Sequence, residues 1–192
     1  MKKIVVINGH PSPDSFGAAL AQAYCQGATA SGAAVREIHI GQLQFTPNLA
    51  HGYQQRLPLE PDLLAAWETL QWADHQVWVH PVWWGGLPAL TKGFIDRVFL
   101  PGLAFRYRPG SRWWDKLLRG KSARIITTLD QPGWYYRLRY GRPSVNQLRR
   151  ATLKFCGVSP VGVTYIGAVR GSTEEQRAAW LRQVERAGGQ LK

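Results

Sequence analysis

The sequence predicts an α/β fold, with a doubly wound, five-stranded parallel sheet and helices on both of its faces. Short runs rich in β-branched residues alternate along the chain with longer stretches in which apolar residues recur every three or four positions. The runs at 4–7, 77–79 and 125–126 are apolar at every position, as in the middle of a parallel sheet that is covered on both sides. This alternation indicates strands joined by crossover helices.

Each expected strand is a short β-branched run, and each expected helix is a longer stretch with one apolar face. The expected strands are 3–8, 35–40, 76–80, 123–128 and 161–166. The expected helices lie near 16–30, 60–72, 88–100, 145–156 and 173–187. Leu90, Phe94 and Val98 show the helical spacing in the third of these helices. The irregular segments 41–59 and 101–121 are long enough to be functional loops.

Length and composition predict one domain over 1–192, because 192 residues with 45% hydrophobic content can bury a full core. The apolar run after Lys3 is too short for an export signal, and no stretch reaches the length of a membrane span. Cys25 and Cys156 sit in apolar, helix-like runs, which favours reduced thiols and a cytoplasmic protein. The chain has no metal-binding motif, so no metal site is expected.

Charge is concentrated in one segment. Residues 97–154 contain 14 basic and 2 acidic residues, which accounts for the whole formal net charge of +12. The segment is either a solvated surface or a face that binds anions. Arg137, Arg139 and Arg142 are candidates to bind the phosphates of NADPH, and the rival interpretations are nucleic acid or anionic lipid. The dinucleotide is preferred, and no nucleic acid is expected.

Three loops should meet at one edge of the sheet, since ligands of such folds bind beyond the carboxyl ends of the strands. The first runs through Gly9 and His10 to Ser15 and enters an alanine-rich helix. Backbone N–H groups at a helix N-terminus, accompanied by hydroxyls and an imidazole, suit a phosphate. The alternative is that Asp14 or Ser15 only caps the helix.

The second loop begins at Pro81 and contains two adjacent tryptophans. Trp83 and Trp84 cannot both point into one core from an extended chain, so one of them should face the crevice and stack on a flat ligand. Gly85 would let backbone N–H groups approach that ligand closely. The alternative is a tryptophan pair that packs beneath 101–121.

The third loop, near 129–136, adds further aromatic and polar groups at a strand end. A phosphate site after the first strand, a flat-ring site after the third and an aromatic wall after the fourth describe a site for flavin mononucleotide (FMN).

Four stretches also carry a family resemblance: Gly9-His10-Pro11 with Ser15-Phe16, the long motif from Pro81 to Phe99, Ile126-Thr127-Thr128, and Phe155-Cys156-Gly157. On these motifs the chain resembles the NAD(P)H:quinone oxidoreductase family of flavodoxin-like flavoproteins. That family includes the flavin-bearing ancillary subunits of glutathione-gated potassium efflux systems.

The resemblance implies a flavodoxin-like fold, FMN as cofactor with FAD as the alternative, NAD(P)H as co-substrate, and a homodimer with active sites at the subunit interface. It implies that the phosphate and ribityl end is held by His10, Ser15, Phe16 and Gly17. It implies that the flavin ring is lined by Pro81, Val82, Trp83, Trp84 and Gly85. The polar edge of the ring would be reached by Thr128, Leu129 and Asp130.

The expected reaction is a two-electron, ping-pong hydride transfer from NAD(P)H to a small quinone-like acceptor. Tyr135, or Tyr136 beside it, is the candidate hydrogen-bond donor to the acceptor oxygen. The alternative function is a regulatory subunit of a membrane transporter with low turnover of its own.

The chain departs from the family pattern at three places. Gly17 and Ala18 stand where the family has asparagine, Leu129 and Asp130 stand where it has two glycines, and 137–144 contains no histidine.

Overall fold

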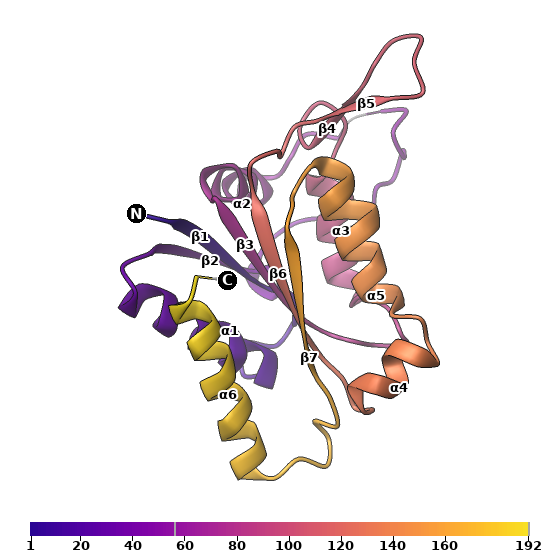
Figure 1. Cartoon of the computed structure of the whole chain (residues 1–192). Helices are drawn as coiled ribbons and strands as arrows, with labels where there is room; N and C mark the ends of the chain where they lie inside the picture. The colour runs from indigo at the N-terminus through magenta and orange to yellow at the C-terminus, as the bar shows by residue number, and fades with distance from the viewer. Residues whose placement is uncertain (56, 192) are drawn as a thin grey trace.

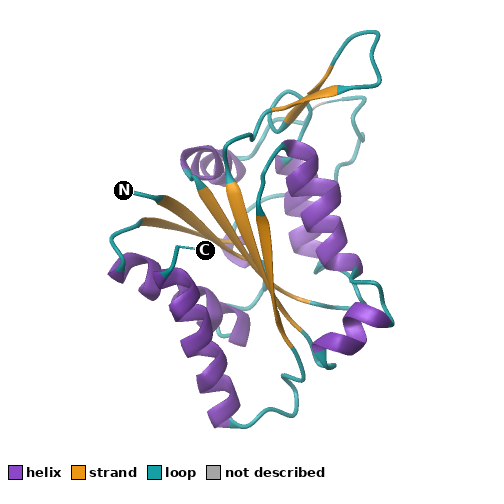
Figure 2. Ribbon diagram, viewed as in Figure 1, coloured by secondary structure: helices purple, strands orange, loops and turns teal. Residues whose placement is uncertain are grey.

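The computed structural model describes residues 1–55 and 57–191. Five parallel strands form one sheet in the order β2-β1-β3-β6-β7 (Figures 1 and 2). They are β1 (Lys3–Asn8), β2 (Ala34–His39), β3 (His75–Pro81), β6 (Ser122–Thr128) and β7 (Val161–Ile166). The five predicted strands are confirmed to within one residue at each end. The order of the strands reverses between β1 and β3, so the crevice that such sheets use for ligands lies at the carboxyl ends of this pair.

Helices cover both faces of the sheet, as predicted (Figure 2). One face carries α1 (Phe16–Ala30) and α6 (Glu174–Gly189), and the other carries α2 (Pro61–Trp72) and α3 (Ala89–Val98). The short helix α5 (Pro143–Asn146) continues on the second face into the π-helical η2 (Gln147–Lys154).

The sheet separates two apolar clusters because successive side chains of a strand point to opposite faces. In β1, Ile4 and Val6 pack under α1 and α6, whereas Val5 and Ile7 pack under α2 and α3. All four side chains are at most 1% exposed. This arrangement explains why the run 4–7 in β1 is apolar at every position.

Two glycines let α1 and α6 pack at close range. A Cβ atom added at Gly27 would meet the backbone oxygen of Glu185, and one added at Gly188 would lie 2.3 Å from the backbone oxygen of Tyr24. No larger side chain fits either position without separating the helices.

The sequence-based prediction missed the hairpin of β4 (Phe105–Tyr107) and β5 (Trp114–Lys116) and the helix α4 (Gly133–Leu138). Within 101–121, which was expected to be irregular, β4 pairs with β5 in an antiparallel hairpin. Figure 1 shows this hairpin projecting beyond the amino ends of the sheet strands. The third loop contains the short helix α4. Both elements are too short to produce a clear hydrophobic period.

A buried arginine fastens the described residues of the segment that follows the short 3-10 helix η1 (Ile40–Gln42). Arg97 is 1% exposed and donates hydrogen bonds to both carboxylate oxygens of Glu60, at 3.0 and 2.7 Å. It also donates to the backbone oxygens of Thr46 and Pro58. These bonds fasten the loop to α3, away from the carboxyl edge of the sheet.

Cys25 and Cys156 are both free and buried, as the sequence predicted. Burial raises the pKa of each thiol to about 12, so neither is a ready nucleophile. Within the two described ranges, no helix has the length and apolar character needed to cross a membrane.

Candidate functional site

The loop after β1 is ordered by its own polar groups. Asn8 Oδ1 accepts a hydrogen bond from the backbone N–H of His10 at 3.0 Å, and His10 Nδ1 accepts one from the N–H of Ser12 at 3.0 Å. A Cβ at Gly9 would lie 2.7 Å from Thr91 Oγ1, so only glycine brings the strand end this close to α3. The loop therefore has a fixed path into helix α1.

The N-terminus of α1 combines a cap with an anion-binding geometry. Ser15 is the N-cap, and its side chain accepts a hydrogen bond from the N–H of Ala18 at 3.1 Å. The capping role proposed for Asp14 or Ser15 is thus confirmed for Ser15. The backbone N–H groups of Phe16 and Gly17 donate to no acceptor among the described residues. These two donors at the positive end of the helix dipole can bind a phosphate.

The ring of Phe16 does not face this site. It lies 6.1 Å from the ring of Trp180, and the guanidinium of Arg177 is 6.0 Å from its centroid. Phe16 therefore offers its backbone N–H to the loop, while its side chain holds α1 against α6.

The loop after β3 makes a tight turn with a tryptophan in a strained conformation. Trp83 and Gly86 exchange backbone hydrogen bonds of 3.2 and 2.9 Å. The two central residues, Trp84 and Gly85, have φ of 52° and 77°, which is the type I′ pattern. Glycine and asparagine suit this conformation, but tryptophan does not.

The Trp84 side chain is fully exposed, whereas Trp83 is 45% exposed. The alternative in which both tryptophans pack beneath 101–121 is therefore wrong. Backbone strain beside an exposed aromatic ring is the kind of outlier that marks a binding site.

Trp83 joins the first two loops. Its ring meets the His10 ring edge to face, with the centroids 5.6 Å apart. The imidazole beside the α1 N-terminus and the exposed aromatic turn therefore belong to one continuous site.

A buried tyrosine supports the turn from below. The Tyr136 hydroxyl donates to the backbone oxygen of Gly85 at 3.1 Å, lies 2.7 Å from Ser144 Oγ, and accepts from the N–H of Ser144 at 3.0 Å. Burial raises the pKa of Tyr136 above its ordinary value. Because the hydroxyl is fully occupied, Tyr136 positions the turn and is not the donor to an acceptor oxygen. Sequence reasoning missed this support, since no local pattern links Gly85 to Ser144.

The loop after β6 completes the edge. The backbone oxygen of Thr128 accepts from the N–H of Val82 at 2.9 Å, so the ends of β3 and β6 are held together. Pro81, at the end of β3, is buried beside Thr128. Leu129 is 3% exposed and packs with the Tyr136 cluster, whereas Asp130 is exposed. Thr128 and Asp130 are thus the accessible side chains here, and Leu129 is a core residue.

Tyr135, the predicted catalytic residue, is 36% exposed on α4. Its ring contacts those of Trp134 and Tyr140 at centroid distances of 5.8 Å each. It is accessible in a way that Tyr136 is not.

Two buried polar atoms lie behind the turn. His80 Nε2 and Thr127 Oγ1 have no hydrogen-bond partner, and the two residues are neighbours across β3 and β6. Burial lowers the pKa of His80 to about 4, and its Nδ1–H donates to the backbone oxygen of Pro81 at 3.0 Å. His80 is therefore neutral at pH 7. A histidine within an apolar strand was the available signal, and the sequence interpretation did not use it.

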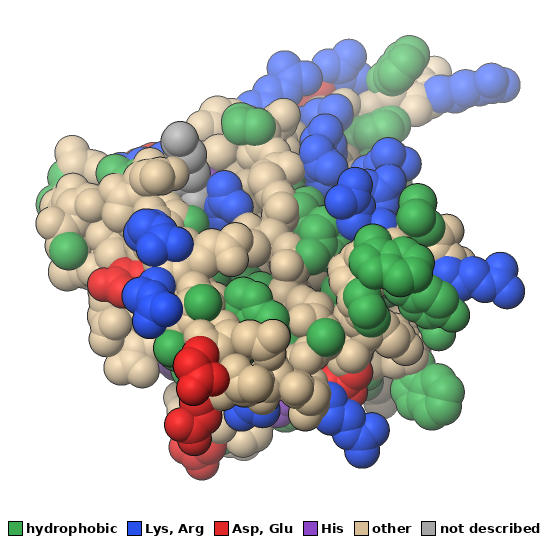
Figure 3. Space-filling view, turned by 60° about the horizontal axis from the view of Figure 1, so that its bottom comes forward, with side chains coloured by type: hydrophobic (Ala, Val, Ile, Leu, Met, Phe, Trp, Pro, Cys, Tyr) green, Lys and Arg blue, Asp and Glu red, His purple; other side chains and the backbone are tan. Residues whose placement is uncertain are grey.

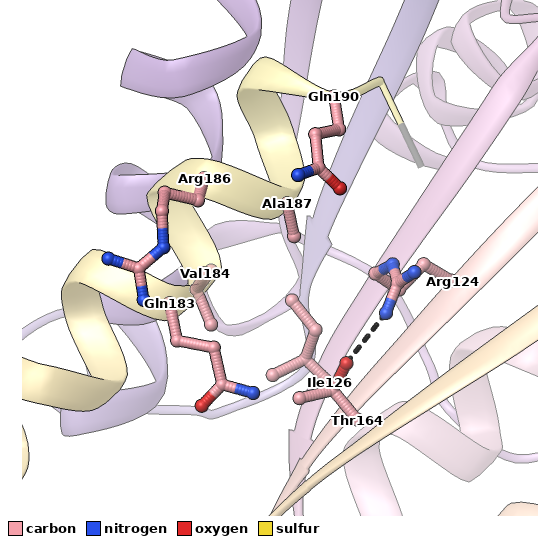
Figure 4. Close-up of a pocket in the computed structure, with 8 residues that line it drawn as sticks. All are labelled: Arg124, Ile126, Thr164, Gln183, Val184, Arg186, Ala187 and Gln190. Atoms are coloured by element: carbon pink, nitrogen blue, oxygen red, sulfur yellow. Dashed lines mark hydrogen bonds between the residues drawn. The ribbon is translucent and has the colours of Figure 1, made fainter.

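Two partly open pockets lie elsewhere in the molecule. One of about 270 Å³ sits between α6 and the strands β6 and β7, with Arg124 donating to Thr164 Oγ1 at 2.7 Å (Figure 4). Another of about 300 Å³ lies between α3, β4 and η2. The site at the carboxyl edge is instead an open shelf beside Trp84.

Comparisons with known proteins agree with this geometry. A family model described as "Flavodoxin-like fold" matches residues 2–187. The chain belongs to this family. The strand order and the ligand edge derived above are those of a flavodoxin-like protein.

Individual relatives have low sequence identity to this chain, but they match it over most of its length. The flavodoxin-like chain is 28% identical over 158 residues to a ribosyldihydronicotinamide dehydrogenase-like protein, traD, of Penicillium crustosum, covering 69% of this chain and 58% of that relative. It is 26% identical over 218 residues to the ribosyldihydronicotinamide dehydrogenase [quinone] of Pongo abelii, covering 96% and 91%. Among solved structures, Smu.1420 from Streptococcus mutans UA159 superposes with a TM-score of 0.83 at 28% identity, covering 99% and 100%.

Proposed function

We propose that this chain is an FMN-dependent NAD(P)H:quinone oxidoreductase. The observation that carries the proposal is the strained, fully exposed Trp84 at the β1/β3 switch point, beside a helix N-terminus with two unpaired N–H donors. Membership of the flavodoxin-like family and the names of relatives that act as dehydrogenases support it.

The donor set fits a flavin mononucleotide. Its phosphate would be held by His10, by Ser15 and by the backbone N–H groups of Phe16 and Gly17. Its ring would lie on Trp84, with Trp83 and the Val82 and Gly85 backbone along its side. Thr128 and Asp130 would reach the polar edge. His80, whose buried Nε2 has no hydrogen-bond partner in the described part of the chain, directly precedes Pro81 at the end of β3.

When bound, the flavin would supply the two-electron chemistry, taking hydride from NAD(P)H and, after the oxidised nucleotide leaves, delivering it to the acceptor. The residues of this chain do the remaining work. Trp84 would stack on the ring and exclude water from the face that it covers. The Tyr136 hydroxyl donates to the backbone oxygen of Gly85, which fixes the turn on which the ring would be held. Tyr135 donates its O–H to the acceptor oxygen as negative charge develops there.

We also propose a homodimer. The shelf beside Trp84 is open, whereas ligand sites usually bury most of the bound molecule, so a second copy would complete it. Helix α3, which follows the Trp84 turn, extends from the shelf toward the β4–β5 hairpin, and a cavity lies along it. Exposed Tyr53 and Tyr107 line this cavity, so they offer an apolar surface for that copy on the face that begins at the shelf. Analytical ultracentrifugation of the wild type and Tyr107→Ser is expected to show a dimer that the substitution weakens. A wild-type monomer would contradict it.

The decisive experiment identifies the cofactor and then separates the two half-reactions. The purified protein is expected to show a flavin absorption spectrum, and the released cofactor should have the mass of FMN rather than FAD. In stopped-flow mixing, Tyr135→Phe is expected to slow reoxidation by a quinone at least about tenfold while flavin reduction by NAD(P)H is retained.

Leu103→Ile, on the side of the sheet's amino edge, is the matched control and should leave both rates unchanged. A protein that takes up neither FMN nor FAD would contradict the whole proposal. Rapid reduction by NAD(P)H with no acceptor activity except beside a transporter would favour the ancillary-subunit alternative.

A further inference from the structure

Helix α4 presents an apolar face to solvent. Trp134 and Leu138 are four residues apart, so they share one side of the helix, and they are 64% and 80% exposed. The rings of Trp134, Tyr135 and Tyr140 follow one another at 5.8 Å. We call the outward side chains of Trp134, Leu138 and Tyr140 the α4 patch. Tyr136, which is buried, faces the turn at Gly85, so the helix carries large apolar side chains on both its inner and its outer side.

Arginines surround the patch. Arg137 and Arg139 are exposed on the same helix and its C-cap, and Asp130 is the one acidic residue between 129 and 142. The guanidinium of Arg137 lies 5.9 Å from the centroid of the Tyr165 ring on β7, and Arg137 directly precedes Leu138 of the patch. Figure 3 shows hydrophobic side chains gathered with Lys and Arg side chains over one part of this face.

The patch adjoins the proposed ring site. A Cβ added at Gly85 would lie 3.6 Å from Tyr140 Cδ1, so the patch begins where the Trp84 turn ends. A surface that touches the patch would therefore also border the opening through which an acceptor reaches the shelf.

An anionic bilayer matches this combination of groups. Tryptophan and tyrosine favour the headgroup level, a projecting leucine favours the acyl region, and arginines favour anionic lipid. A nucleic acid would bind the arginines and could stack on the aromatic rings, but it has no apolar region in which Leu138 could be buried. We propose that the α4 patch docks on anionic lipid bilayers and, given the oxidoreductase function proposed above, that the acceptor is a lipid-soluble quinone.

Vesicle sedimentation tests the docking. Wild-type protein is mixed with vesicles of phosphatidylcholine, or of phosphatidylcholine and phosphatidylglycerol in equal parts, at low and high salt and without nucleotide. Binding is expected only to the anionic vesicles and should weaken with salt. Leu138→Ser should lower the binding constant about tenfold or more, the size expected for one buried leucine.

Trp113→Ser, on the β4–β5 hairpin, is the matched control because Trp113 is 71% exposed among arginines at the opposite edge. It should bind as the wild type does. The docking proposal is overturned if the wild type binds neither vesicle, if both variants lose binding equally, or if duplex DNA binds with the same dependence on Leu138 and vesicles do not. Vesicle binding does not require flavin, so loss of flavin would contradict the oxidoreductase function and not the docking.

A second measurement tests the acceptor. Turnover with a long-chain quinone embedded in anionic vesicles is expected to fall in Leu138→Ser, while turnover with a water-soluble quinone is unchanged. An equal effect on both quinones, or on neither, would overturn the assignment of a lipid-soluble acceptor.

Discussion

The two edges of the sheet carry side chains of the same kinds, yet they are built differently. The amino edge has the β4–β5 hairpin with exposed Tyr107 and Trp113 among arginines, and the carboxyl edge has α4 and the Trp84 turn, again with arginines. Backbone strain at a tryptophan and unpaired helix N–H groups are found at the carboxyl edge. A cluster of aromatic and basic residues therefore does not by itself identify a binding site. The position of the cluster relative to the carboxyl ends of the strands does.

The largest expected effect is acid sensitivity that both edges share. His75 and His80 stand at the amino and carboxyl ends of β3, and burial lowers the pKa of each to about 4. In the unfolded chain each would bind a proton near pH 6.5, so the unfolded state gains protons first as the pH falls.

Stability is therefore full above pH 6.5 and is lost between pH 6.5 and 4, by about 3 kcal/mol for each histidine. Urea unfolding at pH 7 and pH 4.5 measures the loss. His75→Asn and His80→Asn should each remove about half of it. A loss that only one variant reduces would show that the two edges differ here as well.

Close helix packing at the amino edge gives the next effect. In Gly188→Ala the new Cβ would lie 2.3 Å from the backbone oxygen of Tyr24, and the free energy of unfolding should fall by about 2–3 kcal/mol. Gly171→Ala is the control, because a Cβ there has no neighbour within 4 Å, and it should change stability by less than about 0.5 kcal/mol. FMN affinity of the folded protein should be the same in both. Equal stabilities would mean that α1 and α6 can separate at no cost.

The affinity for FMN should distinguish the two edges directly, because the proposed ring site lies only at the carboxyl edge. Trp84→Ala should raise the FMN dissociation constant about 5- to 150-fold, the equivalent of 1–3 kcal/mol of stacking and burial. Trp113→Ala, at the hairpin, should stay within about twofold. Fluorescence titration of FMN measures both. Similar constants in the two variants would assign the flavin to another part of the molecule.

The smallest expected effect is an increase in stability, unlike the losses predicted above. Trp84 has φ of 52°, so Trp84→Gly should raise the free energy of unfolding by about 1 kcal/mol while it weakens FMN binding. Trp113 is not in the left-handed region, and Trp113→Gly should not stabilise the protein. A destabilised Trp84→Gly would show that the exposed ring makes contacts that outweigh the strain.

The sequence predicted the sheet because β1, β3 and β6 each contain a fully apolar run, at 4–7, 77–79 and 125–126, and that pattern follows from burial on both faces. It predicted which three loops meet at the candidate site, because the ends of the strands determine where these loops lie. It did not predict α4 or the hairpin, whose few residues carry no full period. Nor did it predict that Tyr136 holds Gly85, because residues 51 positions apart share no local pattern. The strain at Trp84 was equally hidden, since it is imposed by the two hydrogen bonds between Trp83 and Gly86.

The hydroxyl of Tyr136 makes the two sides of α4 thermodynamically linked. It binds Gly85 and Ser144 together, so any rotation of the helix that moves Trp134 and Leu138 must also strain or release the turn that carries Trp84. A bilayer bound to the α4 patch and a flavin bound at the shelf would thus change each other's affinity by the same factor. In Tyr136→Phe that factor should approach one even if each binds as tightly alone.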